Sequence, residues 1–110
     1  MIEYYERLKK NRELFERAEK IASEIKKKAK GIFEDAEVYI TGSYARGEHT
    51  LSSDLDILIV SERIPEKFSF EFYRDAVIKL TDDPRVNIHL VNRRKFAELK
   101  KLYSPLIPVW

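Results

Sequence analysis

The chain has 110 residues, of which 44% are hydrophobic and 36% charged, and its 21 basic against 19 acidic residues give a formal net charge of +2. This length suits one domain with its own core and leaves no room for a separate substrate-binding domain. The small net charge offers no argument for nucleic-acid binding by overall field, and the absence of cysteine excludes a disulfide framework or a thiolate zinc site.

The first predicted element is an amphipathic helix over Ile2–Lys30, which ends at Gly31 with lysines in its last turn. Its apolar residues recur at spacings of seven, three and four: Leu8, Phe15, Ala18, Ala22, Ile25 and Ala29. The helix is long for so small a domain. Either the whole apolar stripe is core, or the first turns stay free and Tyr4, Tyr5 and Leu8 meet a partner.

A strand is predicted over Glu37–Thr41, which is rich in β-branched and aromatic residues. Gly42 then permits a sharp exit from the strand. If Ser43 opens a short helix through Arg46, the free backbone N–H groups of its first turn and the helix dipole favour an anion above the strand end. The stretch therefore predicts a phosphate-binding turn.

Asp54 and Asp56 begin a second predicted strand, DLDILIV. Residues two apart on a strand share a face, with Cα atoms roughly 6.6 Å apart, whereas Leu55 points to the core. Two carboxylates on one face raise each other's pKa unless a cation lies between them. A hard divalent ion, Mg²⁺ or Mn²⁺, can take their oxygens together with those of a triphosphate.

A second amphipathic helix is predicted to begin at or just after Pro65, with apolar residues every fourth position: Phe68, Phe72, Ala76 and Leu80. Turn-forming residues over 81–84 end it, so Asp82 and Asp83 are interpreted as turn residues and not as metal ligands. A third strand follows over 85–91. Its period of two places Val86, Ile88 and Leu90 on one face, and Asn87, His89 and Val91 on the other.

Asn92 is predicted to cap a last helix, RRKFAELKKLY, whose buried face consists of Phe96, Leu99 and either Leu102 or Tyr103. The tail SPLIPVW contains two prolines and cannot continue that helix. Its apolar residues, Leu106, Ile107, Val109 and Trp110, would be costly to leave in water. The tail is therefore expected either to fold back over the domain or to dock on another chain.

Gly42-Ser43 and Asp54-x-Asp56, separated by ten residues and with Arg46-Gly47 between them, resemble the signature of the DNA polymerase beta superfamily of nucleotidyltransferases. The short length is most similar to the minimal nucleotidyltransferases of bacteria and archaea. The resemblance implies an α/β (α+β) fold, a small mixed sheet of about three or more strands flanked by helices. We expect one domain over 1–110: an N-terminal helix (1–31), a catalytic core (37–91), and a C-terminal helix with an apolar tail (92–110).

The resemblance also implies a function: transfer of AMP from ATP, with Mg²⁺ or Mn²⁺, to an acceptor hydroxyl. Gly42, Ser43, Arg46 and Ser53 would bind the nucleotide, and Asp54 and Asp56 would hold the metals and be the catalytic residues. Larger relatives use a further domain to hold the acceptor, so the acceptor is expected on another chain. By resemblance it is a tyrosine of a helical, ribonuclease-like toxin, with this chain as the antitoxin, and a homo-oligomer through the N-terminal helix or the tail is the other expected assembly.

Members of this superfamily usually carry a third carboxylate on the strand beside Asp-x-Asp, and the matching residue here is Asn87. Asn87 can offer a metal a neutral oxygen but cannot act as a base. His89, next on that face, could accept a proton near neutral pH, although a single strand histidine is more often structural. Glu48 is another possible substitute. Two interpretations remain: an enzyme, or a non-catalytic binding module that neutralises its partner by forming a complex.

The basic clusters at 26–30, 93–95 and 100–101 lie mostly at predicted helix ends, where solvated lysine is common, so nucleic acid is not expected as a partner. No signal peptide and no apolar run long enough to span a bilayer is recognisable, which predicts a cytoplasmic protein with no membrane contact. High charge with no cysteine and only three glycines is also typical of a thermophile.

Overall fold

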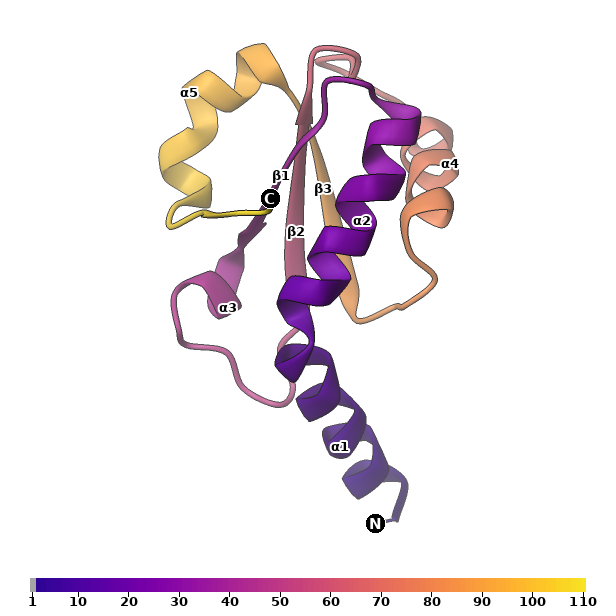
Figure 1. The fold of residues 1–110 in the computed structure, drawn as a ribbon, viewed down its shortest axis with the longest axis vertical. Coiled ribbons are helices and arrows are strands. Elements are labelled where there is room, and N and C mark those ends of the chain that lie inside the picture. The colour runs from indigo at the N-terminus through magenta and orange to yellow at the C-terminus, as the bar shows by residue number, and fades with distance from the viewer. Residues whose placement is uncertain (1) are drawn as a thin grey trace.

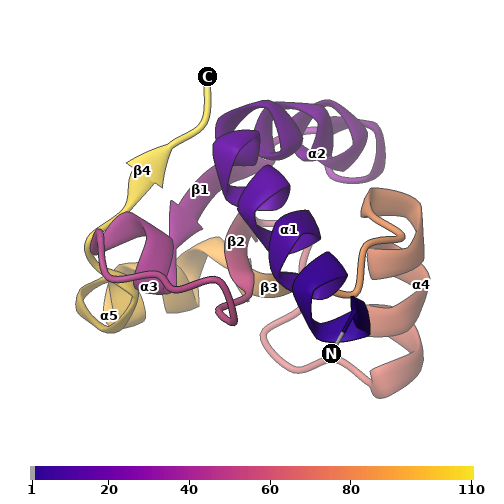
Figure 2. The same cartoon turned by 90° about the horizontal axis from the view of Figure 1, so that it is seen from below.

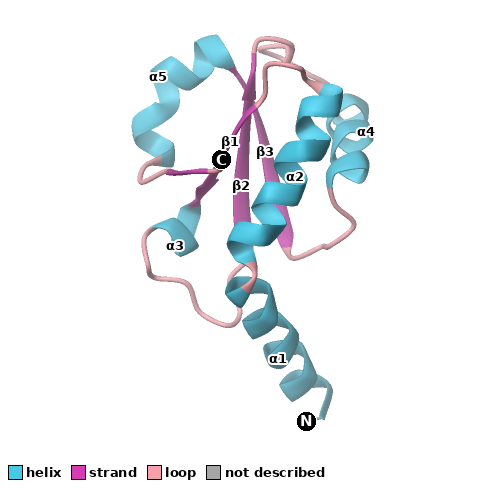
Figure 3. Ribbon diagram, in the orientation of Figure 1, coloured by secondary structure: helices cyan, strands magenta, loops and turns pink. Residues whose placement is uncertain are grey.

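The protein is described by a computed structural model that covers residues 2–110. Its elements follow in chain order as α1 (Ile2–Glu16), α2 (Ala18–Ile32), β1 (Glu37–Thr41), α3 (Gly42–Ala45), β2 (Leu55–Ser61), α4 (Phe70–Leu80), β3 (Val86–Asn92), α5 (Arg93–Tyr103) and β4 (Ile107–Pro108). Figure 1 and Figure 3 show helices packed around one central sheet, which confirms the predicted mixed α/β architecture.

Within residues 2–110 the sheet has four strands in the order β3-β2-β1-β4. β1 is antiparallel to both β2 and β4, whereas β2 and β3 are parallel. A parallel pair needs a crossover connection, and α4 supplies it between β2 and β3. The register sets Thr41 opposite Asp56, and Asp56 opposite Asn87, so these three residues form one row across an end of the sheet.

Helices cover both faces of the sheet (Figure 2). α2 and α4 cover one face, over a core that includes Leu55, Ile57 and Ile59, all fully buried. α5 covers the other face, where Phe96 packs in a smaller cluster with Leu58, Val60 and Val91. Because β2 is central and buried on both sides, its sequence reads as an almost unbroken apolar run.

The helix predicted over 2–30 is in fact two helices that meet at Arg17. The backbone there departs from helical values (φ −109°, ψ 15°), although the Arg17 N–H still bonds to Glu13 O and Leu14 O at 3.1 and 3.2 Å. The end predicted at Gly31 is also wrong by a short margin. α2 runs through Gly31 to Ile32, and the Phe33 N–H closes the last turn on Ala29 O at 2.7 Å.

The α4 helix begins at Phe70, later than the predicted start near Pro65. Its N-cap is Ser69, whose hydroxyl accepts from the Phe72 N–H at 3.1 Å, so Phe68 lies before the helix. The predicted Asn92 cap of α5 is confirmed, because its side chain accepts from the Arg94 N–H at 2.8 Å.

At the end of α5, Tyr103 and not Leu102 packs toward the sheet, since Leu102 is 79% exposed. The C-terminal tail folds back, as one of the two alternatives predicted. β4 pairs with β1, and Val109 is buried, although Trp110 is 93% exposed. Within residues 2–110, no helix has the length and apolar character needed to cross a membrane.

Candidate functional site

The site is built around the turn between β1 and α3. Gly42 has a φ of +71°, and a Cβ placed there would lie 2.1 Å from Oδ2 of Asp56. Both the positive φ and this close approach require glycine. The Asp56 carboxylate therefore lies directly against the backbone of the turn that the sequence predicts to bind phosphate.

Asp56 receives its side-chain contacts from the neighbouring strand β3. Its Oδ1 accepts from Nδ2 of Asn87 at 3.0 Å and lies 3.2 Å from Nε2 of His89. Burial raises the pKa of Asp56, but the hydrogen bonds from His89 and Asn87, together with the positive charge of Arg46, lower it further than burial raises it. Asp56 is therefore ionised at neutral pH.

Asn87 and His89 share one face of β3, as the alternating pattern predicts, and their Nδ2 and Nε2 atoms lie 3.3 Å apart. Two further residues, Thr41 and Tyr103, lie at the site beside Asp56 and His89, respectively. The ring of Tyr103, at the end of α5, meets His89 edge-on at 5.9 Å, and the Tyr103 carbonyl accepts from the Thr41 hydroxyl. Sequence reasoning missed Thr41 and Tyr103, because only the fold brings α5 back over the row that Asp56 occupies.

Asp54 was expected to begin the second strand, but β2 begins at Leu55 and Asp54 lies just before it. Leu55 is fully buried, as predicted, and Asp54 is exposed. Across the described residues, no three or more His, Cys, Asp or Glu side chains gather in a way that could hold a metal ion. The structure thus brings Asp56 together with Asn87 and His89, whereas Asp54 lies exposed just before β2.

Arg46 follows directly after α3 and pairs with Glu48, with Nε 3.1 Å from Oε2. In the structure Glu48 is therefore the ion-pair partner of Arg46. Ser43 lies in the single turn of α3, and its carbonyl accepts from the Glu48 N–H at 2.9 Å. Ser53 has a visible structural role, since its hydroxyl accepts from the Thr50 N–H at 2.9 Å and closes the turn that leads into β2.

The loop between α3 and β2 is anchored by α1. Asn11 is only 4% exposed, and its side-chain amide donates to the Leu51 carbonyl and accepts from Nη1 of Arg85 at 3.3 Å. The Phe15 ring lies 4.5 Å from that of His49, a loop residue. The sequence carries one signal for this anchor: Asn11 is a polar residue at an apolar position of the helical stripe, between Leu8 and Phe15.

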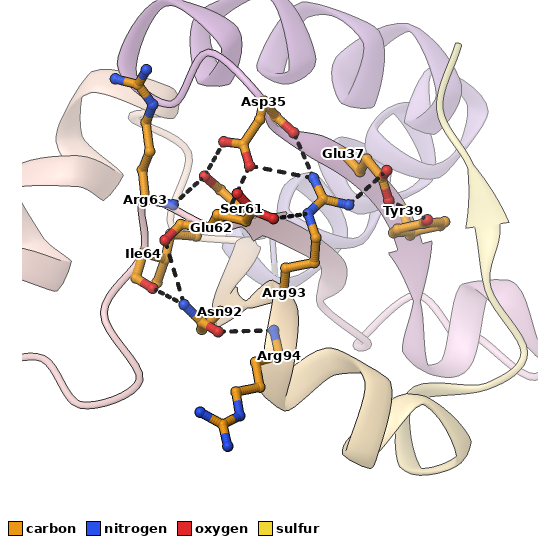
Figure 4. A network of polar contacts seen from close by, with 10 residues as sticks. All are labelled: Asp35, Glu37, Tyr39, Ser61, Glu62, Arg63, Ile64, Asn92, Arg93 and Arg94. Carbon is orange, nitrogen blue, oxygen red and sulfur yellow. Dashed lines mark hydrogen bonds and ion pairs between the residues drawn. The ribbon is translucent and has the colours of Figure 1, made fainter.

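The opposite end of the sheet carries a denser polar network, centred on Asp35 and Arg93 (Figure 4). Asp35 accepts from the Ser61 hydroxyl and from the Glu62 N–H, and these bonds, with a smaller contribution from Arg93, lower its pKa to about 2 against the effect of burial. Arg93 also pairs with Glu37 at 2.9 Å. This network joins the ends of β1, β2 and β3 and is separate from the candidate site.

The sequence matches the nucleotidyltransferase domain family over residues 18–107. That range includes the Gly42 turn and the row that contains Asp56 and Asn87. A search of curated proteins finds no match. Among solved structures, the crystal structure of a "putative nucleotidyltransferase" from Sulfolobus solfataricus at 1.40 Å resolution is similar, with a TM-score of 0.68 and 28% identity over 91% of this chain and 86% of that chain.

Proposed function

Because the chain belongs to the nucleotidyltransferase domain family, we propose that it transfers AMP from ATP to an acceptor hydroxyl, with pyrophosphate leaving. The observation that supports this function most directly is the ionised Asp56 carboxylate, held against the Gly42 turn and beside Asn87 and His89. The family supports nucleotidyl transfer in general.

The triphosphate would bind at the Gly42–Ser43 turn, with Arg46 neutralising its charge. Arg46 now pairs with Glu48, but both side chains are largely exposed, at 47% and 70%. An ion pair exposed to this extent contributes little free energy, so Arg46 can exchange Glu48 for a phosphate at small cost. Ser43 adds a hydroxyl at the same turn, and Ser53, near the end of the loop, would also bind the nucleotide.

The donor set fits one divalent ion that arrives with the nucleotide. Asp54 and Asp56 offer the carboxylate oxygens that Mg²⁺ or Mn²⁺ prefers, and phosphate oxygens would complete the shell. Asn87 can add only a neutral oxygen, and only after its amide rotates, because its nitrogen now faces Asp56. A bound ion would neutralise phosphate charge and favour attack by the acceptor oxygen. A second ion would lack a carboxylate on β3.

The reaction needs the acceptor oxygen to approach the α-phosphorus in line with the departing pyrophosphate oxygen. One P–O bond forms as the other breaks, the acceptor hydroxyl releases its proton to solvent, and the rate depends on how well the acceptor is positioned. We propose that the acceptor is a tyrosine on a helical, toxin-like partner protein that AMP addition would inactivate. The resemblance to minimal nucleotidyltransferases supports this choice.

A second candidate function is a binding module that keeps the fold and neutralises its partner by forming a complex. Asn87 favours it, because the residue beside Asp56 on β3 is an amide that donates a hydrogen bond where superfamily members usually carry a third carboxylate. Nucleotide binding could persist in such a module, since Asp54, Asp56 and the Gly42 turn do not depend on that carboxylate.

The test is incubation with labelled ATP and Mg²⁺ or Mn²⁺, with and without the protein encoded beside this one, followed by intact mass measurement. Added AMP on either chain would establish the transfer and identify the acceptor. Asn87→Asp should raise the transfer rate sharply if only the third carboxylate is lacking. A stable complex without any added AMP, unchanged by Asn87→Asp, would favour the binding module.

A further inference from the structure

Three aromatic rings join the end of α1 to the phosphate-binding turn. Phe15 is 7% exposed, and its ring stacks on that of Tyr44, with the centroids 6.0 Å apart and the planes 9° apart. His49 completes the group, since its ring lies 4.5 Å from that of Phe15 and 5.1 Å from that of Tyr44. We call these three residues the aromatic clamp. They come from α1, from α3 and from the loop that runs from α3 toward α1 in Figure 2, so the clamp connects three segments.

The aromatic clamp contacts the turn from two sides. Tyr44 belongs to the single turn of α3, which also contains Gly42 and Ser43. The loop is bonded back to this turn, because the Glu48 N–H donates to the Ser43 carbonyl at 2.9 Å. His49 is the next residue of the loop. A change in the position of either clamp ring therefore displaces the backbone proposed to bind the triphosphate, and small displacements of a binding group are costly.

Asn11, one turn earlier in α1, makes a second connection. Its side-chain amide donates to the Leu51 carbonyl in the loop and accepts from Nη1 of Arg85 at 3.3 Å. The carbonyl of Arg85 in turn accepts from the Leu55 N–H at 2.9 Å. Because Leu55 is the first residue of β2 and directly precedes Asp56, Asn11 is connected both to the loop and to the strand that carries the carboxylate.

Only the last turns of α1 pack against the rest of the domain. Its buried residues are Asn11, Leu14 and Phe15, whereas Ile2 is 75% exposed. A helix held by so few side chains can separate locally from the domain at a low cost in free energy. The helix also ends at Glu16, before the range that matches the nucleotidyltransferase family, which begins at residue 18. The contacts of Asn11 and Phe15 therefore come from outside the matched range.

We propose that Asn11 and Phe15 are positioning residues for nucleotide binding, and that nucleotide binding is coupled to the packing of α1. The coupling rests on the proposed function, since it requires the triphosphate to bind at the Gly42–Ser43 turn. With α1 packed, the aromatic clamp holds this turn in one position. Linkage makes the effect reciprocal: if packing of α1 strengthens nucleotide binding by some factor, a bound nucleotide strengthens the packing of α1 by the same factor.

The test uses the full chain with Mg²⁺ and an ATP analogue that has a methylene group between the α- and β-phosphorus atoms, so that it binds without transfer. Phe15→Leu keeps an apolar side chain but removes the stacked ring. Its Kd for the analogue, measured by calorimetry, should rise at least about fivefold. In the transfer assay this variant should raise the KM for ATP more than it lowers kcat, because the turn is displaced while the Asp56 carboxylate remains.

A second measurement needs no substitution. Binding of the analogue to the wild-type chain should slow the amide hydrogen exchange of the last turns of α1, around Asn11 and Phe15, because the bound nucleotide disfavours local release of the helix. In Phe15→Leu the slowing should be smaller. A purely structural role of Phe15 would not make the exchange of α1 depend on nucleotide.

Phe33→Leu is the matched control. Phe33 is 4% exposed in the same core cluster and its ring lies 6.3 Å from that of Phe72, but it is two residues from Asp35, at the other end of the sheet. This variant should lower the thermal midpoint as Phe15→Leu does and leave the Kd for the analogue unchanged.

The outcomes separate the coupling from the proposed function. A wild-type chain that does not bind the analogue overturns both. If the wild-type chain binds it, but Phe15→Leu binds it equally well or the exchange of α1 does not slow, only the coupling is overturned. The coupling is also overturned if Phe33→Leu weakens binding as much as Phe15→Leu, because the loss then follows from lower stability in general.

Discussion

The two ends of the sheet treat their carboxylates differently. At the end that holds Asp35, the carboxylate has a hydroxyl, a backbone N–H and the Arg93 guanidinium as partners. At the end that holds Asp56, the partners are Asn87 and His89, and Arg46 is paired with Glu48. Asp35 is hydrogen-bonded and ion-paired within the fold, so it contributes to stability. Asp56 is also ionised, but the arginine near it is exposed and can exchange its partner, so this end of the sheet is available to a ligand.

We infer that the end of the sheet around Asp56 is less stable because it is shaped for ligand binding, and that the end around Asp35 contributes more to the stability of the fold. The difference can be tested by substitutions on each side. Changes at the Asp56 end should affect transfer, and changes at the Asp35 end should affect unfolding.

Gly42→Ala should have the largest effect, because it acts on both properties. The new Cβ would lie 2.1 Å from the Asp56 carboxylate in a residue with a φ of +71°. We expect AMP transfer to be lost, and the free energy of unfolding to fall by about 1–3 kcal/mol from the strained backbone alone. The measurements are the transfer assay and urea unfolding.

Gly47→Ala is the matched control, because Gly47 has the same φ of +71° but no atom within 4 Å of its Cβ position. Gly47→Ala should lower the free energy of unfolding by a similar amount, because the backbone strain is similar. AMP transfer should be unchanged. If both variants lose transfer equally, the close approach of Asp56 is not what requires glycine at position 42.

Asp56→Asn should lower transfer on the order of 100-fold or more, because it removes the negative charge while it keeps the shape of the side chain. The thermal midpoint should change little, since the Asn87 amide can still donate to the remaining oxygen. Initial rates with labelled ATP and a thermal unfolding curve provide the two readings. An active Asp56→Asn chain would remove Asp56 from the proposed mechanism.

Asp35→Asn should show the opposite result: a lower thermal midpoint and unchanged transfer. Because the pKa of Asp35 is lowered to about 2 in the folded chain, its contribution to stability is present above the unfolded pKa of about 3.9 and is lost as the pH falls through 2. The stability gap between wild type and Asp35→Asn should therefore narrow between about pH 5 and pH 2 in urea unfolding.

Asp75→Asn serves as the comparison for that experiment, because Asp75 makes only an exposed pair with Arg74, at 3.8 Å. Its unfolding curve should follow that of the wild type at every pH. If the difference in unfolding free energy between wild type and Asp35→Asn stays constant down to pH 2, the ionised carboxylate of Asp35 is not what stabilises this end of the sheet.

The local parts of this fold could be predicted from sequence because they rest on short-range patterns. The strand over Glu37–Thr41, the faces of β3 and the Asn92 cap depend on residues within a few positions of each other. Asn87 beside Asp56 was also predictable, once the two strands were taken as neighbours. Contacts between distant segments could not be predicted: Arg93 with Asp35 and Tyr103 against His89 have no local signal, and the polar Asn11 in the apolar stripe of α1 indicates a buried contact without showing that its partner is the loop.

The bend at Arg17 has the same origin. A continuous amphipathic stripe predicts one straight helix, yet the part of that stripe in α1 contacts the loop between α3 and β2 as well as the core. Phe15 packs in the same core cluster as Ala18, Ala22 and Ile25, and in addition Asn11 and Phe15 contact the loop. The hydrophobic period alone does not show where the additional contact with the loop begins, because both kinds of contact need the same spacing.

Asn11→Leu tests whether α1 holds the site end in place, and its expected effect is the smallest. The substitution removes the donor to the Leu51 carbonyl and the acceptor for Nη1 of Arg85, which keeps its pair with Asp83, and should lower the free energy of unfolding by about 1–3 kcal/mol. Loop residues 46–54 should exchange their amide hydrogens faster, and ATP affinity should fall several-fold. Leu14→Met, a volume-conserving change one turn away, should leave loop exchange unaltered. If the loop exchanges at the wild-type rate in Asn11→Leu, then its order comes from the turn at Thr50–Ser53 and not from α1.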